Sequence, residues 1–191
     1  KILNLIEESS RILIITHVNP DGDTLGCASA LKSYIGDKAD ILIQISDNFQ
    51  FPKTYSFLPY LNSSKNLSTL EDIYDLIIAV DVASADRIID NARTIFNKAQ
   101  NTIVIDHHKT NARFADYLYL DSDAAATAEI IYSLLLEMGI KLTRDIATCI
   151  YEGIYTDTGS FKYSNTTSNT LKTAADLLKY GVNPSLISDN M

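Results

Sequence analysis

The chain has 191 residues, of which 46% are apolar and 21% charged, and its formal net charge is −8 at neutral pH. That length suffices for one domain, or slightly more, with a full hydrophobic core. The composition is ordinary for a globular protein. The negative charge disfavours a surface that binds nucleic acid by general electrostatics. The sequence contains no apolar run near the roughly 18 residues that a membrane span needs.

A strand, a polar turn and a helix are predicted in succession between residues 11 and 31. The turn contains His17, Asp21 and Asp23, which this order places at the carboxyl end of a strand, where open α/β sheets bind ligands. An imidazole and two carboxylates suit a divalent metal ion. The alternative for the two aspartates is that they only form the turn and cap the helix.

The rest of the chain alternates between apolar runs and helical patterns. Further strands are predicted at 39–45, 74–81, 101–108 and 117–120, and helices at 1–10, 85–98, 124–138, 144–157 and 167–180. Residues 47–68, with Pro52 and Pro59, are expected to be irregular. The two cysteines, Cys27 and Cys149, each fall singly in a helical pattern and are expected to be small buried residues, which fits a reducing cytoplasm.

This alternation predicts an α/β fold with a parallel sheet of about five strands and helices on both faces. The glycine-rich fingerprints of two nucleotide-binding folds are missing. No GxGxxG follows a strand, and there is no GxxxxGK[ST]. The chain is therefore neither a Rossmann dehydrogenase nor a P-loop NTPase.

Acidic and histidine side chains end three of the predicted interior strands. These side chains lie in the turn at 17–23, at Asp81, and in the run Asp106-His107-His108. All three histidines of the chain fall in these places. Parallel strands bring these ends to one edge of the sheet. For the run at 106–108 the alternative is a surface turn.

Asp157 ends the predicted helix at 144–157, where a negative charge opposes the helix dipole and a bound cation would remove the conflict. Together with Asp157, the residues at the strand ends offer more donor groups than one metal ion takes. Two ions bridged by a carboxylate fit the set and suit phosphoester hydrolysis. Mixed imidazole and carboxylate donors favour Mn²⁺, with Mg²⁺ or Co²⁺ as substitutes.

Four segments in this order, HVNPDGD (17–23), VDVASADR (80–87), VIDHH (104–108) and TDTGSF (156–161), resemble the four motifs of the DHH phosphoesterase family. Each motif alone is weak, whereas four in register are strong. The resemblance covers about residues 11–165. The segments TAEIIYSLL (127–135) and FKYSNTT (161–167) are most similar to the nanoRNase/pAp phosphatase (NrnA-like) branch.

The resemblance implies roles for named residues. One metal ion would be held by His17, Asp21 and Asp81, and a second by Asp23, Asp81, His107 and Asp157, with Asp81 as the bridge. His108 would face the substrate phosphate and Asp106 would orient a neighbouring imidazole, so these two are the expected catalytic residues. Arg87 and Lys109 are candidate phosphate-binding residues, with ordinary solvated charges as the alternative.

One departure from the branch concerns the end of the chain. Branch members carry a second domain with a glycine-rich, histidine-containing substrate motif, and nothing here matches it. We therefore expect a catalytic domain at 1–181, and at 182–191 the start of a connecting helix or linker toward an absent C-terminal substrate-binding domain.

The expected function is that of a phosphoric ester hydrolase acting on short oligoribonucleotides, dinucleotides or 3′-phosphoadenosine 5′-phosphate (pAp). Two alternatives from the same family are a manganese inorganic pyrophosphatase and a cyclic-dinucleotide phosphodiesterase. An alternative from another class is a non-catalytic nucleotide-binding module. The expected partner is a short RNA or nucleotide substrate and not a membrane, the location is cytoplasmic, and a homodimer is the assembly considered.

Overall fold

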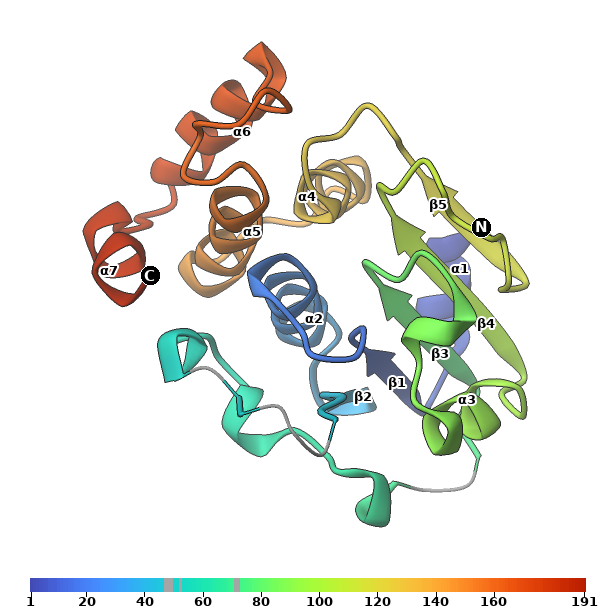
Figure 1. The fold of residues 1–191 in the computed structure, drawn as a ribbon. Helices are drawn as coiled ribbons and strands as arrows, with labels where there is room; N and C mark the ends of the chain where they lie inside the picture. Colours follow the sequence, from blue (N-terminus) through green and yellow to red (C-terminus); the bar gives the residue numbers. More distant parts are fainter. Residues whose placement is uncertain (47–49, 52, 71–72) are drawn as a thin grey trace.

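The protein is built around a five-stranded, fully parallel sheet in the order β2-β1-β3-β4-β5 (Figure 1). The computed structural model describes residues 1–46, 50–51, 53–70 and 73–191. The strands are β1 (Ile12–Ile15), β2 (Ala39–Leu42), β3 (Leu76–Val80), β4 (Asn101–Asp106) and β5 (Tyr117–Leu120). The predicted α/β class and the parallel sheet are thus confirmed.

Helices cover both faces of the sheet. They are α1 (Ile2–Glu8), α2 (Gly22–Ile35), α3 (Asp90–Phe96), α4 (Thr127–Glu137), α5 (Arg144–Asp157), α6 (Ser168–Leu178) and α7 (Pro184–Asn190). Helix α3 lies on one face, and α2 and α4 lie on the other with α5 outside them, followed by α6 and α7 farthest from the sheet (Figure 1). Among the described residues, none of these helices is long and apolar enough to cross a bilayer.

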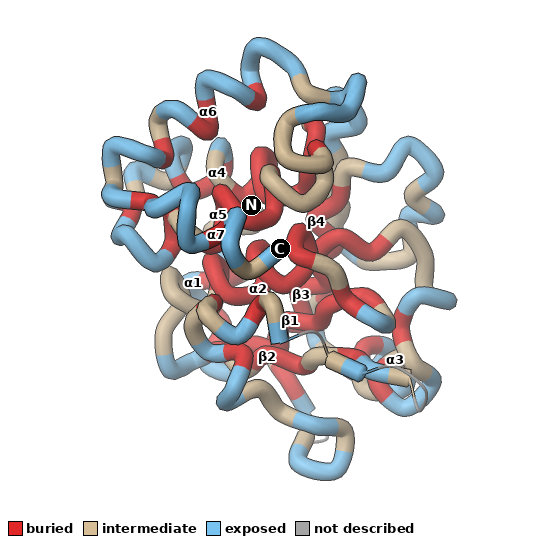
Figure 2. Tube along the Cα trace, turned by 60° about the vertical axis from the view of Figure 1, so that its left-hand side comes forward, coloured by how far each residue is buried: buried red, intermediate tan, exposed pale blue. Residues whose placement is uncertain are grey.

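The central strands β1 and β3 are buried on both sides, as their continuous apolar sequences require, whereas the edge strand β5 is half-buried. In β1, Ile12 and Ile14 belong to the core beneath α2, α4 and α5, whereas Leu13 and Ile15 pack toward α3. The strands accordingly form the buried centre of the molecule (Figure 2). A sheet covered in this way exposes only its ends and edges, so a polar site has to lie at a strand end.

Several predicted elements are shorter in the structure. Strand β4 ends at Asp106, which leaves His107 and His108 in the following loop. The helix predicted at 85–98 is split into a 3-10 turn (Ala85–Arg87) and α3, because the chain is extended at Ile89, whose N–H donates to Gln44 Oε1 at 2.6 Å.

The segment predicted to be irregular contains three short 3-10 turns, at 53–55, 61–63 and 67–69. The part of the prediction that falls on 47–49 and 52 lies outside the described residues.

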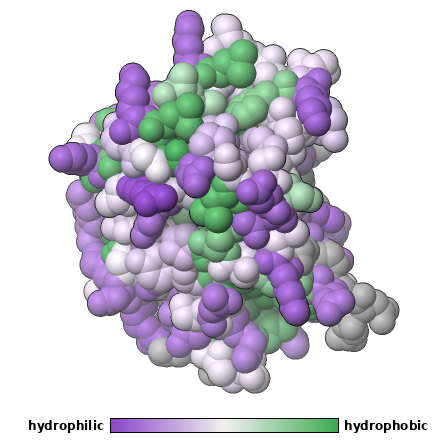
Figure 3. Space-filling view, turned by 90° about the vertical axis from the view of Figure 1, so that its left-hand side faces the viewer, coloured by the Kyte–Doolittle hydropathy of each residue, from purple (hydrophilic) through white to green (hydrophobic). Residues whose placement is uncertain are grey.

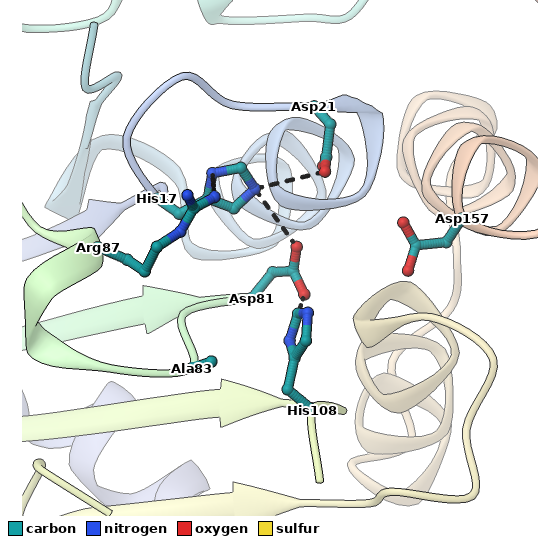
Figure 4. A pocket seen from close by; sticks show the side chains of 7 residues that line it. All are labelled: His17, Asp21, Asp81, Ala83, Arg87, His108 and Asp157. Carbon is teal, nitrogen blue, oxygen red and sulfur yellow. Dashed lines mark hydrogen bonds and ion pairs between the residues drawn. The ribbon is translucent and has the colours of Figure 1, made fainter. Parts of the chain in front are cut away.

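Helices α2 and α5 approach closely because glycines lie at their contact. A Cβ added to Gly26 would lie 2.4 Å from the carbonyl oxygen of Cys149, and one added to Gly153 would lie 2.7 Å from Oδ1 of Asp23. This close packing places Asp157, at the carboxyl end of α5, beside Asp21, which caps the start of α2 (Figure 4). Asp23 lies in the first turn of α2.

Replacing Gly26 by alanine is expected to destabilise the fold by about 1–3 kcal/mol, because the new methyl group meets backbone atoms that cannot move aside alone. Urea denaturation measures the free energy of unfolding. Ser33→Ala, on the same helix but only half-buried, serves as the control. Equal stability of the two variants would contradict the close-packing account.

Candidate metal centre

The polar strand ends predicted from the sequence meet at the carboxyl edge of the sheet. In the order β2-β1-β3-β4-β5, strand β2 lies on one side of β1 and β3 on the other, so the winding of the chain reverses between β1 and β3. Open α/β sheets bind ligands at such a switch point. His17 follows β1, Asp81 follows β3, and His107 and His108 follow β4. The three strand ends therefore converge on one place (Figure 4).

One group of donors consists of His17, Asp21 and Asp81. Nε2 of His17 lies 3.5 Å from Oδ2 of Asp21 and 3.6 Å from Oδ2 of Asp81. Oδ1 of Asp21 accepts the N–H groups of Asp23 and Thr24 as the cap of α2. One oxygen of Asp21 therefore caps the helix, and the other faces the imidazole of His17.

Asp81 has the central place, and its backbone is strained. Its φ is +60°, in the left-handed region that residues with a Cβ rarely adopt. Its Oδ1 accepts a hydrogen bond of 2.8 Å from the Thr127 hydroxyl and also lies 3.7 Å from Nε2 of His107. Such strain is typical of functional positions, and here the carboxylate faces His17 on one side and His107 on the other.

A second group consists of Asp23, His107 and Asp157. Asp23 is fully buried, and its oxygens accept the N–H groups of Thr127 (2.7 Å) and Ala128 (2.9 Å) at the start of α4. Nε2 of His107 lies 3.2 Å from Oδ2 of Asp157. The partial positive charge of the helix start thus supports a carboxylate that lies deep in the molecule.

His108 and Asp106 form a third arrangement. Nδ1 of His108 and Oδ1 of Asp106 are 2.7 Å apart, and Asp106 is fully buried. This hydrogen bond raises the pKa of His108. Burial alone would raise the pKa of Asp106, but its hydrogen bonds to His108 and Asn111 lower it. The pair therefore favours a charged carboxylate beside a protonated imidazole.

The crowding of carboxylates perturbs both of the donor groups described first. Burial, reinforced by the negative charges of Asp21 and Asp157, raises the pKa of Asp81 to about 6. Burial, together with the charges of Asp81 and Asp157, raises the pKa of Asp23 well above its usual range. Burial lowers the pKa of His107, but the surrounding carboxylates outweigh it and raise that pKa to about 10.

These donors fit a divalent cation. The nearest donor atoms within each of three groups lie within 4.8 Å of one another: His17 with Asp21 and Asp81, Asp23 with His107 and Asp157, and Asp81 with His107 and His108. In the described part of the chain, the buried Nε2 of His107 has no well-aligned hydrogen-bond partner, although Oδ2 of Asp157 lies 3.2 Å away. A nitrogen that faces a carboxylate without a regular hydrogen bond, among carboxylates that repel one another, is an arrangement that a cation would satisfy.

The remaining predicted residues lie at different distances from the centre. Arg87 lines a cavity of about 160 Å³ together with His17, Asp81 and His108, and its Nη2 is 3.0 Å from Nδ1 of His17 (Figure 4). Lys109 does not line this cavity. It borders a neighbouring hollow of about 400 Å³ that shares His108.

Two residues of the site were missed by the sequence analysis. Thr127 contacts both Asp81 and Asp23 but lies in a segment that the sequence assigns only to a helix and to the resemblance with the NrnA-like branch. Asn111, which donates to Asp106, is not among the predicted site residues. Neither carried a signal of its own, because each depends on a contact between distant parts of the chain.

Glu152 is a third missed residue and lies behind the centre. It is fully buried, Oε1 accepts the Thr156 hydroxyl at 3.0 Å, and Oε2 has no hydrogen-bond partner among the described residues. Burial raises its pKa from 4.5 to about 7. The folded protein therefore keeps a proton that the unfolded chain releases.

This pKa predicts how stability depends on pH. Because the folded state binds the extra proton, the Glu152 carboxyl lowers the free energy of unfolding as pH rises from about 4.5 to about 7. In metal-free buffer, Glu152→Gln should gain about 3 kcal/mol relative to wild type between pH 4.5 and pH 8. Urea denaturation at both pH values measures this difference in the free energy of unfolding. Glu137→Gln, at an exposed position, is the control. The same pH dependence in both variants would refute the assignment.

Comparison with known proteins places the chain in a family. The model of the DHH family, N-terminal domain, matches residues 11–154. The bifunctional oligoribonuclease and PAP phosphatase NrnA of Thermus thermophilus is 33% identical over 180 residues, which are 94% of this chain and 53% of that protein. A probable enzyme of the same name from Streptococcus mutans is 34% identical over 186 residues, covering 94% of this chain and 56% of that protein.

Solved structures share the fold. An exopolyphosphatase-related protein from Bacteroides fragilis has a TM-score of 0.87 at 22% identity, and the match covers 99% of this chain and 58% of that protein's chain. A putative family II inorganic pyrophosphatase from Methanococcus jannaschii has a TM-score of 0.68 at 20% identity, and the match covers 94% of this chain and 59% of that protein's chain. The chain spans about half the length of the curated relatives it matches. Since the family model covers well over half of its residues, the chain belongs to the DHH family and corresponds to that family's N-terminal domain.

Proposed function

We propose that this chain is the catalytic part of a phosphoesterase that depends on two divalent metal ions, most readily Mn²⁺, with Mg²⁺ or Co²⁺ as substitutes. Its proposed substrates are short oligoribonucleotides, dinucleotides and pAp. The observation that carries the proposal is that Asp81 belongs to two groups of metal donors at one edge of the sheet, one with His17 and Asp21 and one with His107 and His108. Family membership and the names of the relatives support the choice of substrate.

The proposed ligands combine these donor groups. His17, Asp21 and Asp81 would hold one ion, and Asp23, His107 and Asp157 the other. Asp81 would be shared between the ions, because its Oδ1 lies 3.7 Å from Nε2 of His107. The chemistry that such a pair supplies when bound is a hydroxide nucleophile near neutral pH and compensation of the charge on a phosphoryl group. Binding would also release protons from the imidazoles, whose pKa values the carboxylates raise.

The catalytic role of the protein side chains centres on His108. Asp106 occupies its Nδ1 and favours the protonated ring, so Nε2 is the nitrogen left to hold a proton for the leaving oxygen. Arg87 borders the same cavity and would bind a phosphate oxygen. Lys109, beside the adjoining hollow, would contact a part of the substrate farther from the attacked phosphorus.

We further propose that residues 1–181 form the catalytic domain and that 182–191 begin the connection to a substrate-binding domain. The relatives are nearly twice as long as this chain, which supports a second domain in the whole protein. Apolar side chains also remain exposed on α6 and α7, among them Leu171, Leu178 and Leu186. Figure 3 shows green apolar patches between polar side chains on the side of the molecule where these helices lie.

The proposed activity is tested with one panel of substrates in Mn²⁺, namely pAp, the dinucleotide pApA, a five-residue RNA, pyrophosphate and cyclic di-AMP. We expect hydrolysis of pAp and of the dinucleotide. Removing a hydrogen-bond partner of a metal ligand typically lowers activity about 10–100-fold. Asp81→Asn should lower activity by more than this, because it removes the shared ligand itself.

The matched control is Asp37→Asn, an exposed aspartate at the opposite end of α2 from Asp23, which should keep wild-type activity. Melting temperatures with EDTA and with Mn²⁺ check that both variants fold. Hydrolysis of pyrophosphate alone would replace the proposed substrate class. No hydrolysis of any substrate by a folded, Mn²⁺-saturated wild type would refute the proposal.

A further inference from the structure

The side chain of Asn111 connects two of the strand ends that build the centre. It lies in the loop after β4, and its Nδ2 donates to Oδ2 of Asp106 at 2.7 Å and to the carbonyl oxygen of Val82 at 3.2 Å. Its Oδ1 accepts the N–H of Arg113 at 2.8 Å, and its own N–H donates to the carbonyl oxygen of His108 at 3.0 Å. Both ends of the amide are therefore held in place.

The contact with Asp106 decides how that carboxylate is oriented. Asp106 is fully buried, its Oδ1 is bound to His108 Nδ1, and its Oδ2 receives the Asn111 amide. A carboxylate with a donor on each oxygen cannot rotate without breaking one of these hydrogen bonds, and Asp106 is itself closed off from solvent. Asn111 thus fixes the plane in which Asp106 meets the imidazole.

The contact with Val82 ties the same loop to the turn after β3. Val82 follows Asp81 directly, and a second bond, from the N–H of Ala112 to the carbonyl oxygen of Ala83 at 2.8 Å, joins the two segments again. Across this junction, Nδ1 of His108 lies 3.6 Å from Oδ1 of Asp81 (Figure 4). The Asn111 amide therefore links the partner of the His108 imidazole to the turn that carries Asp81.

We infer that Asn111 is a positioning residue of the active site, which acts on His108 through Asp106 and through the turn that carries Asp81. The inference rests on the proposed function, because positioning matters for a reaction only if His108 takes part in one. Among the described residues, Asn111 forms no hydrogen bond to the side chain of a proposed metal ligand or to a side chain that lines the cavity; its bonds go to the Asp106 carboxylate and to the backbone of Val82, His108 and Arg113.

The test uses Asn111→Asp, which keeps an acceptor for the N–H of Arg113 but places a carboxylate against Asp106. With a small activated ester such as bis-p-nitrophenyl phosphate in Mn²⁺, kcat should fall by about 10–100-fold, while KM and the affinity for Mn²⁺ measured by calorimetry stay at wild-type values. Asn183→Asp, the same exchange at the exposed cap of α7, is the control. If Asn111→Asp does not fold, Asn111→Ala removes the amide without adding charge.

A second measurement does not depend on activity. In metal-free protein, the proton between His108 Nδ1 and Asp106 should give a far-downfield NMR signal, which Asp106→Asn identifies by removing it. We expect the signal to be lost or shifted upfield in the Asn111 variants and to persist in Asn183→Asp. An unchanged signal would overturn the inference even if the wild type hydrolyses nothing. Unchanged kcat in a folded Asn111 variant would overturn it as well.

Discussion

The structure depends on bringing several carboxylates together, two of them, Asp23 and Asp81, buried in the protein. Burial and the charge of Asp81 raise the pKa of Asp23, and burial and the charges of Asp21 and Asp157 raise the pKa of Asp81. Without a cation, the protein compensates in part by protonating imidazoles, as the raised pKa of His107 shows. The polar contacts around the centre can be understood as ways to hold these charges in fixed positions.

The fold supplies this support through its backbone. The parallel sheet directs three strand ends to one edge, and its winding reverses there, between β1 and β3. The start of α2 binds one oxygen of Asp21, and the start of α4 binds both oxygens of Asp23. The first turns of both helices thus place backbone N–H groups and partial positive charge where the carboxylates gather. The glycine contacts between α2 and α5 then bring Asp157 close to the group from the opposite side.

The sequence predicts the part of this arrangement that follows from local pattern. Apolar runs ending in His or Asp identify β1, β3 and β4, and parallel pairing is enough to predict that His17, Asp81 and His107 converge. Local pattern does not predict that Thr127 and Asn111 join distant strand ends, since neither lies at the end of a strand. Nor does it predict the break in the helix expected at 85–98, which depends on a hydrogen bond to Gln44 in another segment. Long-range contacts decide these features.

The central claim is that Asp81 is shared by two metal ions. Crystals grown with Mn²⁺ and measured at the manganese absorption edge test it directly, because anomalous scattering locates the metal without assuming its ligands. We predict two peaks about 3.5–4 Å apart, one beside His17 and Asp21 and one beside Asp23, His107 and Asp157, with the Asp81 carboxylate between them. A single peak, or two peaks that do not share Asp81, would contradict the account.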